Sequence, residues 1–255
     1  LANKLNTELF VVHLLDDHHF KAMVPDDTQK NFRLEKKVVA MEKLQAKCRE
    51  TYAEAGIRPK ETPYHCQVLD LPFERNVLEF AESEKADLII AGLRGANFLE
   101  RLLIGSHTEN LIDYSDIPVL AVTSDFMLPE ITTGLTAISV KHPPTKNQWH
   151  TLANLNEKLQ LTLKAITLYQ TEESAEKAET EFIKCLHDNP HSGLITDFIA
   201  IPATDVPEAL IRIVSTEKQL LILFRRERST FESLFKSKLS TELAAKAGLS
   251  FLAIP

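Results

Sequence analysis

The chain has 255 residues, of which 44% are apolar and 25% are charged, and its formal net charge is −7. These values fit a globular protein built from one large domain or two small ones. The acidic balance argues against a general role in nucleic-acid binding. The sequence contains no run of 18 apolar residues and no recognisable signal peptide, so we expect neither a membrane protein nor a secreted one. The three cysteines lack metal-ligand spacing, so we expect reduced thiols and a cytoplasmic location.

Apolar runs and helical periodicity alternate along the first half of the chain. Residues 1–6 are typical of the end of a helix that runs into a strand, so we expect natural residues upstream of Leu1. From residue 34 to residue 52, apolar side chains recur every three or four positions, which predicts an amphipathic helix. A shorter helix is expected at 73–83 and another from about residue 106, and strands are expected at 9–15, 64–69, 88–91 and 118–122.

The second half repeats this order. Helices are expected around Trp149, which we interpret as a packing residue, and at 173–186, 206–215 and up to about 245. Strands are expected at 135–140, 161–168, 195–201, 220–224 and 251–254. Strands that alternate with helices predict a parallel sheet covered on both faces.

The two halves can be overlaid without a gap. When residues 87–122 are shifted by 132 they fall on 219–254, and eight positions are identical, among them Leu88/Leu220, Ile90/Ile222 and Leu120/Leu252. Both segments also end their half with the same strand–loop–helix–strand order. We therefore predict two tandem domains, 1–128 and 129–255.

Glycine is concentrated in one window of the first half. Three of the seven glycines lie in the pattern Gly92-x-x-Gly95-x9-Gly105-Ser106, directly behind an apolar strand. Glycine lets backbone N–H groups approach a ligand closely, and a strand, a glycine loop and a helix start together form a common phosphate site. The alternative is a simple tight turn after the strand.

The second copy does not keep this window. Phe224, Glu227, Ser237 and Lys238 replace the three glycines and Ser106. The run from Arg225 to Arg228 is basic, but Glu227 interrupts it, so we expect a solvated loop. The scaffold therefore repeats, whereas the predicted phosphate site does not.

Other candidate sites are weaker. Ser106 and Glu109 have the spacing of a capping box, which stabilises a helix start with or without a ligand. Residues 16–19 read Asp-Asp-His-His but lack the spacing of a metal site, and no metal ligand is assigned. The chain has no GxSxG, Walker A, HExxH or GxGxxG motif, so no catalytic residue is assigned and ATP hydrolysis should be at most slow and incidental.

The glycine window, the following Thr108-Glu109-Asn110-Leu111 and the strand Pro118-Val119-Leu120-Ala121-Val122 together resemble the nucleotide-binding signature of the universal stress protein (UspA) family. The resemblance implies two Rossmann-like domains of the adenine nucleotide alpha hydrolase type. Each would be a five-stranded parallel α/β sheet with helices on both faces. It also implies that the first domain lacks its N-terminal strand in this chain, because the family's first strand would lie before Leu1.

The resemblance also implies a nucleotide site. Leu14 matches a position whose backbone meets adenine, and Ala91 and Gly92 match the ribose and phosphate end. Arg94 and Gly95 would form the turn of the loop, while Gly105, Ser106 and His107 would present N–H and hydroxyl groups to phosphate. The implied ligands are ATP and Mg²⁺ held through the phosphates. In the second half, His142 falls where the family carries an acidic residue, so that half is expected not to bind nucleotide.

Three functions are compatible with this reading. The first is a nucleotide-dependent regulator of the stress response, with its two domains paired through their last strands, 119–122 and 251–254, and with a homo-oligomer left open. The second is an adaptor that dimerises and binds proteins rather than nucleotide. The third is an ATP-dependent transferase or hydrolase. We rank them in this order.

Overall fold

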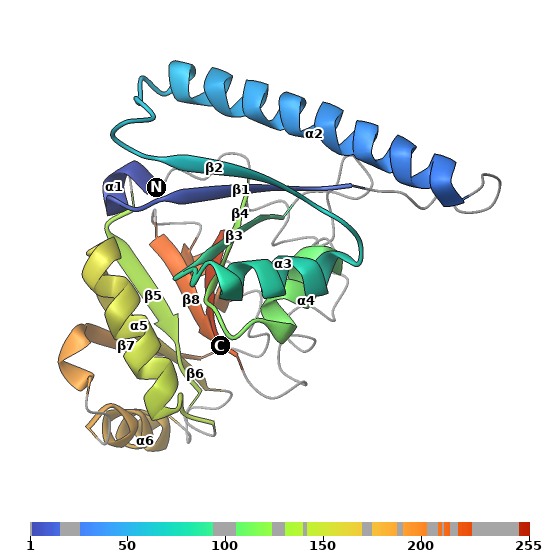
Figure 1. Ribbon diagram of the computed structural model, residues 1–255. Coiled ribbons are helices and arrows are strands. Elements are labelled where there is room, and N and C mark those ends of the chain that lie inside the picture. The colour runs from blue at the N-terminus through green and yellow to red at the C-terminus, as the bar shows by residue number, and fades with distance from the viewer. Residues whose placement is uncertain are drawn as a thin grey trace. The chain divides into compact units, whose positions relative to one another are not determined.

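The computed structural model describes most of the chain in two compact units, Leu1–Glu84 and Lys85–Pro255 (Figure 1). We describe each unit separately. The described residues are 2–15, 26–93, 106–123, 131–139, 142–169, 175–187, 191–202, 209–210, 212–214, 219–225 and 250–255. The helix predicted up to residue 245 lies outside them, and of the helix predicted at 206–215 only 209–210 and 212–214 are described, as helical.

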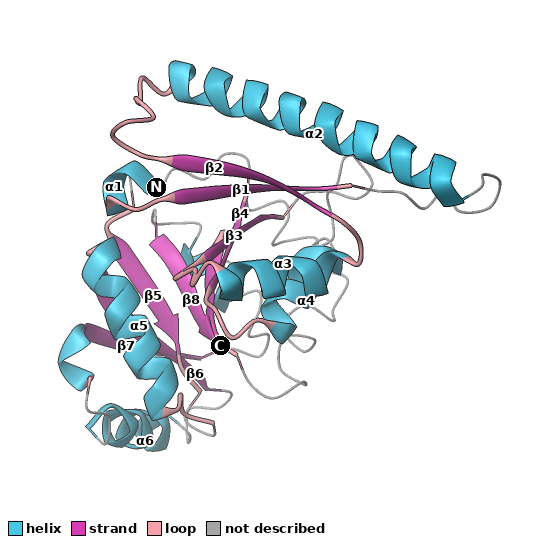
Figure 2. Ribbon diagram, in the orientation of Figure 1, coloured by secondary structure: helices cyan, strands magenta, loops and turns pink. Residues whose placement is uncertain are grey.

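The first unit contains a two-stranded parallel sheet and three helices (Figure 2). Strand β1 (Leu9–Leu14) pairs with β2 (Tyr64–Leu69) from Leu9↔Tyr64 to Leu14↔Leu69. The predicted strand and helix at 64–69 and 73–83 are confirmed to the residue, and the short α1 precedes β1 as expected. The helices are α1 (Ala2–Leu5), α2 (Asp26–Glu54) and α3 (Phe73–Ser83).

Helix α2 buries only the C-terminal half of its predicted apolar face. Cys48 and Tyr52 are buried, whereas Leu34 and Val38 are 64% and 51% exposed, so the prediction is wrong for these two positions. The physical reason is length: 29 helical residues span about 43 Å, whereas a six-residue strand spans about 20 Å. Helix α2 therefore runs well past the ends of β1 and β2 (Figure 1).

An ionic contact fixes the N-terminal half of α2 instead. Asp70, directly after β2, accepts hydrogen bonds from Lys37 Nζ at 2.6 Å and from Arg33 Nε at 3.3 Å. Partial burial raises the pKa of Asp70, but the hydrogen bonds from Lys37 and Arg33 outweigh it, so the pKa lies below its usual value. The carboxylate is thus held ionised at neutral pH.

The second unit is built on a seven-stranded sheet with the order β3-β4-β9-β8-β5-β6-β7. Five adjacent strands of this sheet are mutually parallel and form the sheet predicted for the second half; in sheet order they are β9, β8, β5, β6 and β7. The strands are β3 (Ile89–Gly92), β4 (Val119–Val122), β5 (Thr133–Ala137), β6 (Thr162–Tyr169), β7 (Ile195–Pro202), β8 (Gln219–Phe224) and β9 (Phe251–Ile254). The helices are α4 (Ser106–Tyr114), α5 (Lys146–Leu159), α6 (Ala175–His187) and the short 3-10 helix η4 (Ser192–Leu194).

The internal repeat is visible in the strand register. In the first copy Ile89 lies opposite Val119 in the parallel pair β3–β4, and in the second copy Leu221 lies opposite Phe251 in β8–β9. Both pairs are related by the same shift of 132 residues. The next hydrogen bond repeats as well, since Leu93 N donates to Val122 O and Arg225 N donates to Ile254 O.

The two copies join through their last strands. Strands β4 and β9 pair antiparallel, with Val119↔Ala253, Leu120↔Leu252 and Ala121↔Phe251. The central pair, Leu120 and Leu252, consists of equivalent residues of the repeat, so the joint has the self-complementary form of a two-fold interface. All six of these residues are at most 3% exposed, which makes the joint part of the core.

The first half differs from the second at one place in its strand order. In the second half β5 lies between β6 and β8. In chain order, β1 and β3 of the first half correspond to β6 and β8 of the second. Strand β5 pairs with both β6 and β8, but no described strand pairs with both β1 and β3. The four described strands of the first half therefore form two separate pairs rather than one sheet.

Candidate functional site

The candidate site begins at the carboxyl end of β3. Ala91 and Gly92 are its last two residues, and Gly92 is exposed. Gly92 pairs with Val122 in the β3–β4 ladder, and its φ lies outside the left-handed region that favours glycine. The backbone at Gly92 itself is therefore ordinary strand, and Gly95, the other glycine of the alternative tight turn, lies outside the described residues.

Packing does not require glycine at this position either. A Cβ built on Gly92 meets no described atom within 4 Å. By contrast, a Cβ on Gly134 in β5 would lie 2.8 Å from both Ile222 Cδ1 and Leu163 Cδ2, so there the core demands glycine. Gly92 leaves open space at a strand end where parallel sheets commonly bind ligands.

Helix α4 starts beside this strand end. The hydroxyl of Thr108, in the first turn of α4, donates a hydrogen bond to the carbonyl oxygen of Gly92 at 2.8 Å. Thr108 is 5% exposed and Gly92 is exposed, so the contact is partly buried. The first turn of a nine-residue helix, with N–H groups that lack helical partners, is thus held next to Gly92.

The predicted site residues divide as follows. The structure brings Ala91 and Gly92 together with the helix start at Ser106, and His107 is exposed in its first turn. Leu14 is the last residue of β1 and belongs to the first unit. The side chain of Ser106, and with it the predicted capping box, lies outside the described residues, as do Arg94, Gly95 and Gly105.

The equivalent position of the second copy is filled by the protein itself. Phe224, the counterpart of Gly92, stacks against Trp149 with ring centroids 5.1 Å apart and planes tilted by 54°. Trp149 is only 2% exposed, which confirms its predicted role in packing. The neighbouring Gln148 donates to the carbonyl oxygen of Arg225 at 2.6 Å.

The sequence reading of Arg225 as part of a solvated loop is wrong. Its guanidinium donates to the carbonyl oxygens of Ser115 at 2.5 Å and Asp113 at 3.2 Å, where α4 ends, and to the carboxylate of Asp116 at 3.3 Å. A cation at this end satisfies carbonyls that have no helical partner. No local pattern could reveal this contact, because 110 residues separate Arg225 from Ser115.

The sequence reading gives no role to two further polar contacts, the Ser250–Thr123 pair and the hydrogen bond from Thr108 to Gly92. Ser250 and Thr123 are buried at the β4–β9 joint, where Thr123 N donates to Ser250 Oγ at 3.0 Å. Thr108 was noted only as part of the signature, without a role of its own. His142 follows β5 in the chain; its N–H donates to Ser139 O at 3.1 Å, and its side chain is exposed.

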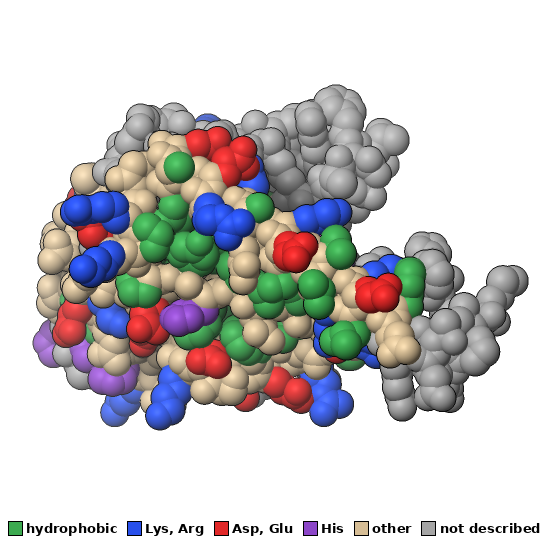
Figure 3. Space-filling view, turned by 45° about the horizontal axis from the view of Figure 1, so that its top comes forward, with side chains coloured by type: hydrophobic (Ala, Val, Ile, Leu, Met, Phe, Trp, Pro, Cys, Tyr) green, Lys and Arg blue, Asp and Glu red, His purple; other side chains and the backbone are tan. Residues whose placement is uncertain are grey.

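The described residues contain no group of three or more His, Cys, Asp or Glu that could hold a metal ion. Residues 16–19, which carry the Asp-Asp-His-His run, lie outside the described part. No described helix is both long and apolar enough to cross a membrane. On the face drawn in Figure 3, Lys and Arg side chains are interspersed with Asp and Glu.

These features define an α/β protein in which a parallel strand pair occurs twice, as β3–β4 and as β8–β9, and the last strands of the two copies pair antiparallel. The strand end carries Gly92 in one copy and Phe224 in the other. Comparison with known proteins identifies the class. Residues 1–123 match the model of the universal stress protein family. This segment, just under half of the chain, is similar to the universal stress protein family.

Two curated relatives come from Methanocaldococcus jannaschii, and both are universal stress proteins. The first is 29% identical over 122 residues, which cover 48% of this chain and 68% of the relative. The second is 44% identical over 55 residues, which cover 22% of this chain and 33% of the relative.

Solved structures extend the likeness in fold to the whole chain. A universal stress protein of Pseudomonas aeruginosa superposes with a TM-score of 0.57 at 14% identity, covering 100% of this chain and 95% of its own. One from Archaeoglobus fulgidus also has a TM-score of 0.57, at 15% identity, covering 96% of this chain and 85% of its own. At this identity the likeness shows the fold alone.

Proposed function

We propose that the chain is a tandem universal stress protein whose first half binds ATP at the carboxyl end of β3, and that occupancy of this site regulates a stress response. The second half acts as a partner that does not bind nucleotide. The observation that carries the proposal is Gly92, a strand glycine that neither its backbone conformation nor any described neighbour requires.

The chemistry of the described residues fits a phosphate group. Helix N–H groups and the helix dipole favour an anion at the start of α4, and the bond from Thr108 to Gly92 holds that helix start against the strand. A side chain at position 92 would enter space at the strand end that no described atom fills within 4 Å of the Cβ. Mg²⁺ would bridge phosphate oxygens and reduce their charge, with no protein carboxylate assigned to it.

The second half gives the proposal its asymmetry. Where the first half has an open glycine, the second has the Phe224 ring packed on Trp149. An aromatic ring offers no donor to a phosphate and takes up the space. The β4–β9 pairing then makes the second half a built-in partner, in the arrangement that two identical domains would use.

The test is calorimetric titration of Mg²⁺–ATP into the full-length protein. We expect one site per chain with a dissociation constant below about 1 mM, which corresponds to about −4 kcal/mol. No binding in this range would overturn the nucleotide proposal and leave the protein-binding adaptor as the better reading. Turnover of ATP well above the uncatalysed background would instead favour the enzyme.

A further inference from the structure

Two cysteines of the first unit lie in contact. Cys48 on α2 and Cys66 on β2 are 18 residues apart in sequence, and Cys66 Sγ lies 3.6 Å from Cys48 Sγ in a thiol–thiol hydrogen bond. A disulfide has its sulfur atoms about 2.05 Å apart. The two sulfur atoms must therefore approach by only about 1.5 Å, a movement within reach of side-chain rotation.

The two thiols differ in their access to solvent. Cys48 is 7% exposed. Its burial raises its pKa to about 11. Cys66 is half-buried and lines a surface pocket of about 460 Å³ that lies wholly within the first unit. A small oxidant can thus reach Cys66 but not Cys48.

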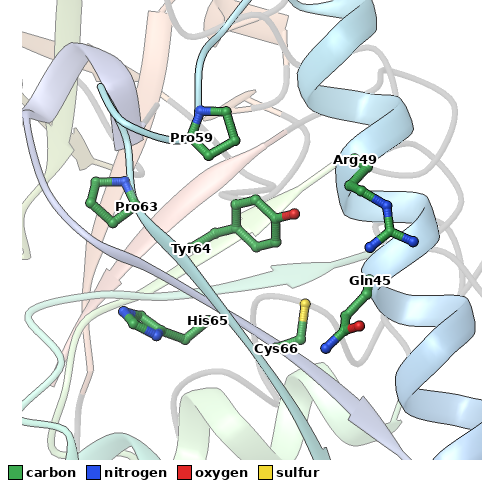
Figure 4. A pocket seen from close by; sticks show the side chains of 7 residues that line it. All are labelled: Gln45, Arg49, Pro59, Pro63, Tyr64, His65 and Cys66. Atoms are coloured by element: carbon green, nitrogen blue, oxygen red, sulfur yellow. The ribbon is translucent and has the colours of Figure 1, made fainter.

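The pocket surrounds Cys66 with polar groups. Figure 4 shows the Cys66 sulfur facing the space between Tyr64 and the α2 side chains Gln45 and Arg49. The guanidinium of Arg49 is close enough to lower the pKa of the neighbouring Cys48, although burial outweighs this effect. Arg49 also lines the pocket, so a polar oxidant that enters the pocket meets a cation.

We propose that Cys48 and Cys66 form a redox-active dithiol that hydrogen peroxide oxidises to a disulfide, with Cys66 oxidised first and Cys48 as the resolving thiol. The Cys66 thiolate attacks one oxygen of the peroxide, the O–O bond breaks, and the departing hydroxide takes a proton to become water. Cys66 is then a sulfenic acid. Cys48 gives up its proton and attacks the Cys66 sulfur, the S–O bond breaks, and a second water leaves.

The balance is two thiols and one hydrogen peroxide giving one disulfide and two waters. The new bond would tie α2 to β2 beside the Tyr52–Tyr64 ring pair, whose centroids are 4.7 Å apart. Because Cys48 sits where α2 is buried, the bond would fix the one part of this long helix that packs on the strands. The inference is independent of the nucleotide proposal, since it uses residues of the first unit alone.

The experiment treats the reduced full-length protein with hydrogen peroxide and follows it by alkylation and peptide mass spectrometry. We expect the wild type to lose about 2 Da, the mass of two hydrogens, with Cys48 and Cys66 linked and Cys185 still alkylated. Dithiothreitol should restore both thiols. The same treatment of the protein unfolded in urea should give the link at least tenfold more slowly, because the two thiols are then no longer held in contact.

Three variants assign the roles. In Cys48→Ala, which places no polar group in the core, a sulfenic-acid probe such as dimedone should label Cys66. In Cys66→Ser neither the link nor the label should form on the time scale of the wild type, and Cys185→Ser should behave as the wild type. Labelling of Cys48 in Cys66→Ser at the wild-type rate would reverse the roles and overturn the order of attack. If peroxide modifies Cys185 while Cys48 and Cys66 remain alkylatable, the dithiol itself is refuted.

Discussion

Replacing Gly92 with valine separates a structural glycine from a functional one. Gly92 is an exposed strand residue with ordinary φ, and a Cβ there meets no described atom within 4 Å. Valine suits strands better than glycine, and removing glycine also reduces the entropy of the unfolded chain. We expect Gly92→Val to stabilise the protein by about 0.5–1 kcal/mol.

The same substitution at Gly134 serves as the matched control. There the new Cβ alone would approach Ile222 and Leu163 to 2.8 Å, and both side chains are fully buried. Overpacking of this kind costs about 1–3 kcal/mol. Gly134→Val should therefore lower the free energy of unfolding, whereas Gly92→Val should not.

Gly92→Val should weaken nucleotide binding even though it stabilises the fold. The valine side chain at position 92 occupies the space proposed for phosphate, so the affinity for Mg²⁺–ATP should fall at least tenfold, or about 1.4 kcal/mol. Gly134→Val, measured at a temperature where it is folded, should keep the wild-type affinity. Denaturant titration gives the stabilities and calorimetry gives the affinities. If Gly92→Val binds ATP as the wild type does, or if it destabilises the fold, the reasoning about Gly92 fails.

Three further predictions concern contacts that the structure revealed. Arg225→Gln removes the cation at the end of α4 and should lower the free energy of unfolding, measured by denaturant titration, by about 1–2 kcal/mol. Asp116→Asn changes a carboxylate that is 89% exposed and should lower it by less than about 0.5 kcal/mol. Equal losses in the two variants would contradict the capping role of Arg225. Phe224→Gly restores glycine at the second-copy position and should cost about 2–3 kcal/mol by exposing Trp149 without creating a second ATP site, which calorimetric stoichiometry would reveal. The pKa of Asp70 is lowered in the folded state, so its contribution to stability is present above its unfolded pKa of about 4 and is lost as pH falls through the folded pKa. Asp70→Asn should therefore flatten the acid side of a plot of unfolding free energy against pH. An unchanged acid side would count against the ionic contact that fixes α2.

Most elements of this fold could be predicted because they depend on local periodicity. The strand at 64–69 and the helix at 73–83 were placed to the residue, since each is a short apolar run or helical period bounded by polar or proline residues. The apolar face of α2 was predicted too long, because periodicity shows which side of a helix is apolar and not how far the sheet beneath it extends. Of the proposed site residues, the structure places Ala91 and Gly92 at the end of β3 and Ser106 at the start of α4, and the nucleotide site itself stays a prediction.

The sequence by itself determined the alternation of strands and helices, the repeat by 132 residues and the loss of the glycines in the second copy. These are properties of residue order, which local backbone preferences and side-chain size translate directly into structure. Only the tertiary structure decided that Arg225 caps α4, that Phe224 packs on Trp149 where the first copy has Gly92, and that Cys48 touches Cys66. Such contacts join residues on separate elements, and their geometry arises when those elements pack, so no local pattern carries them.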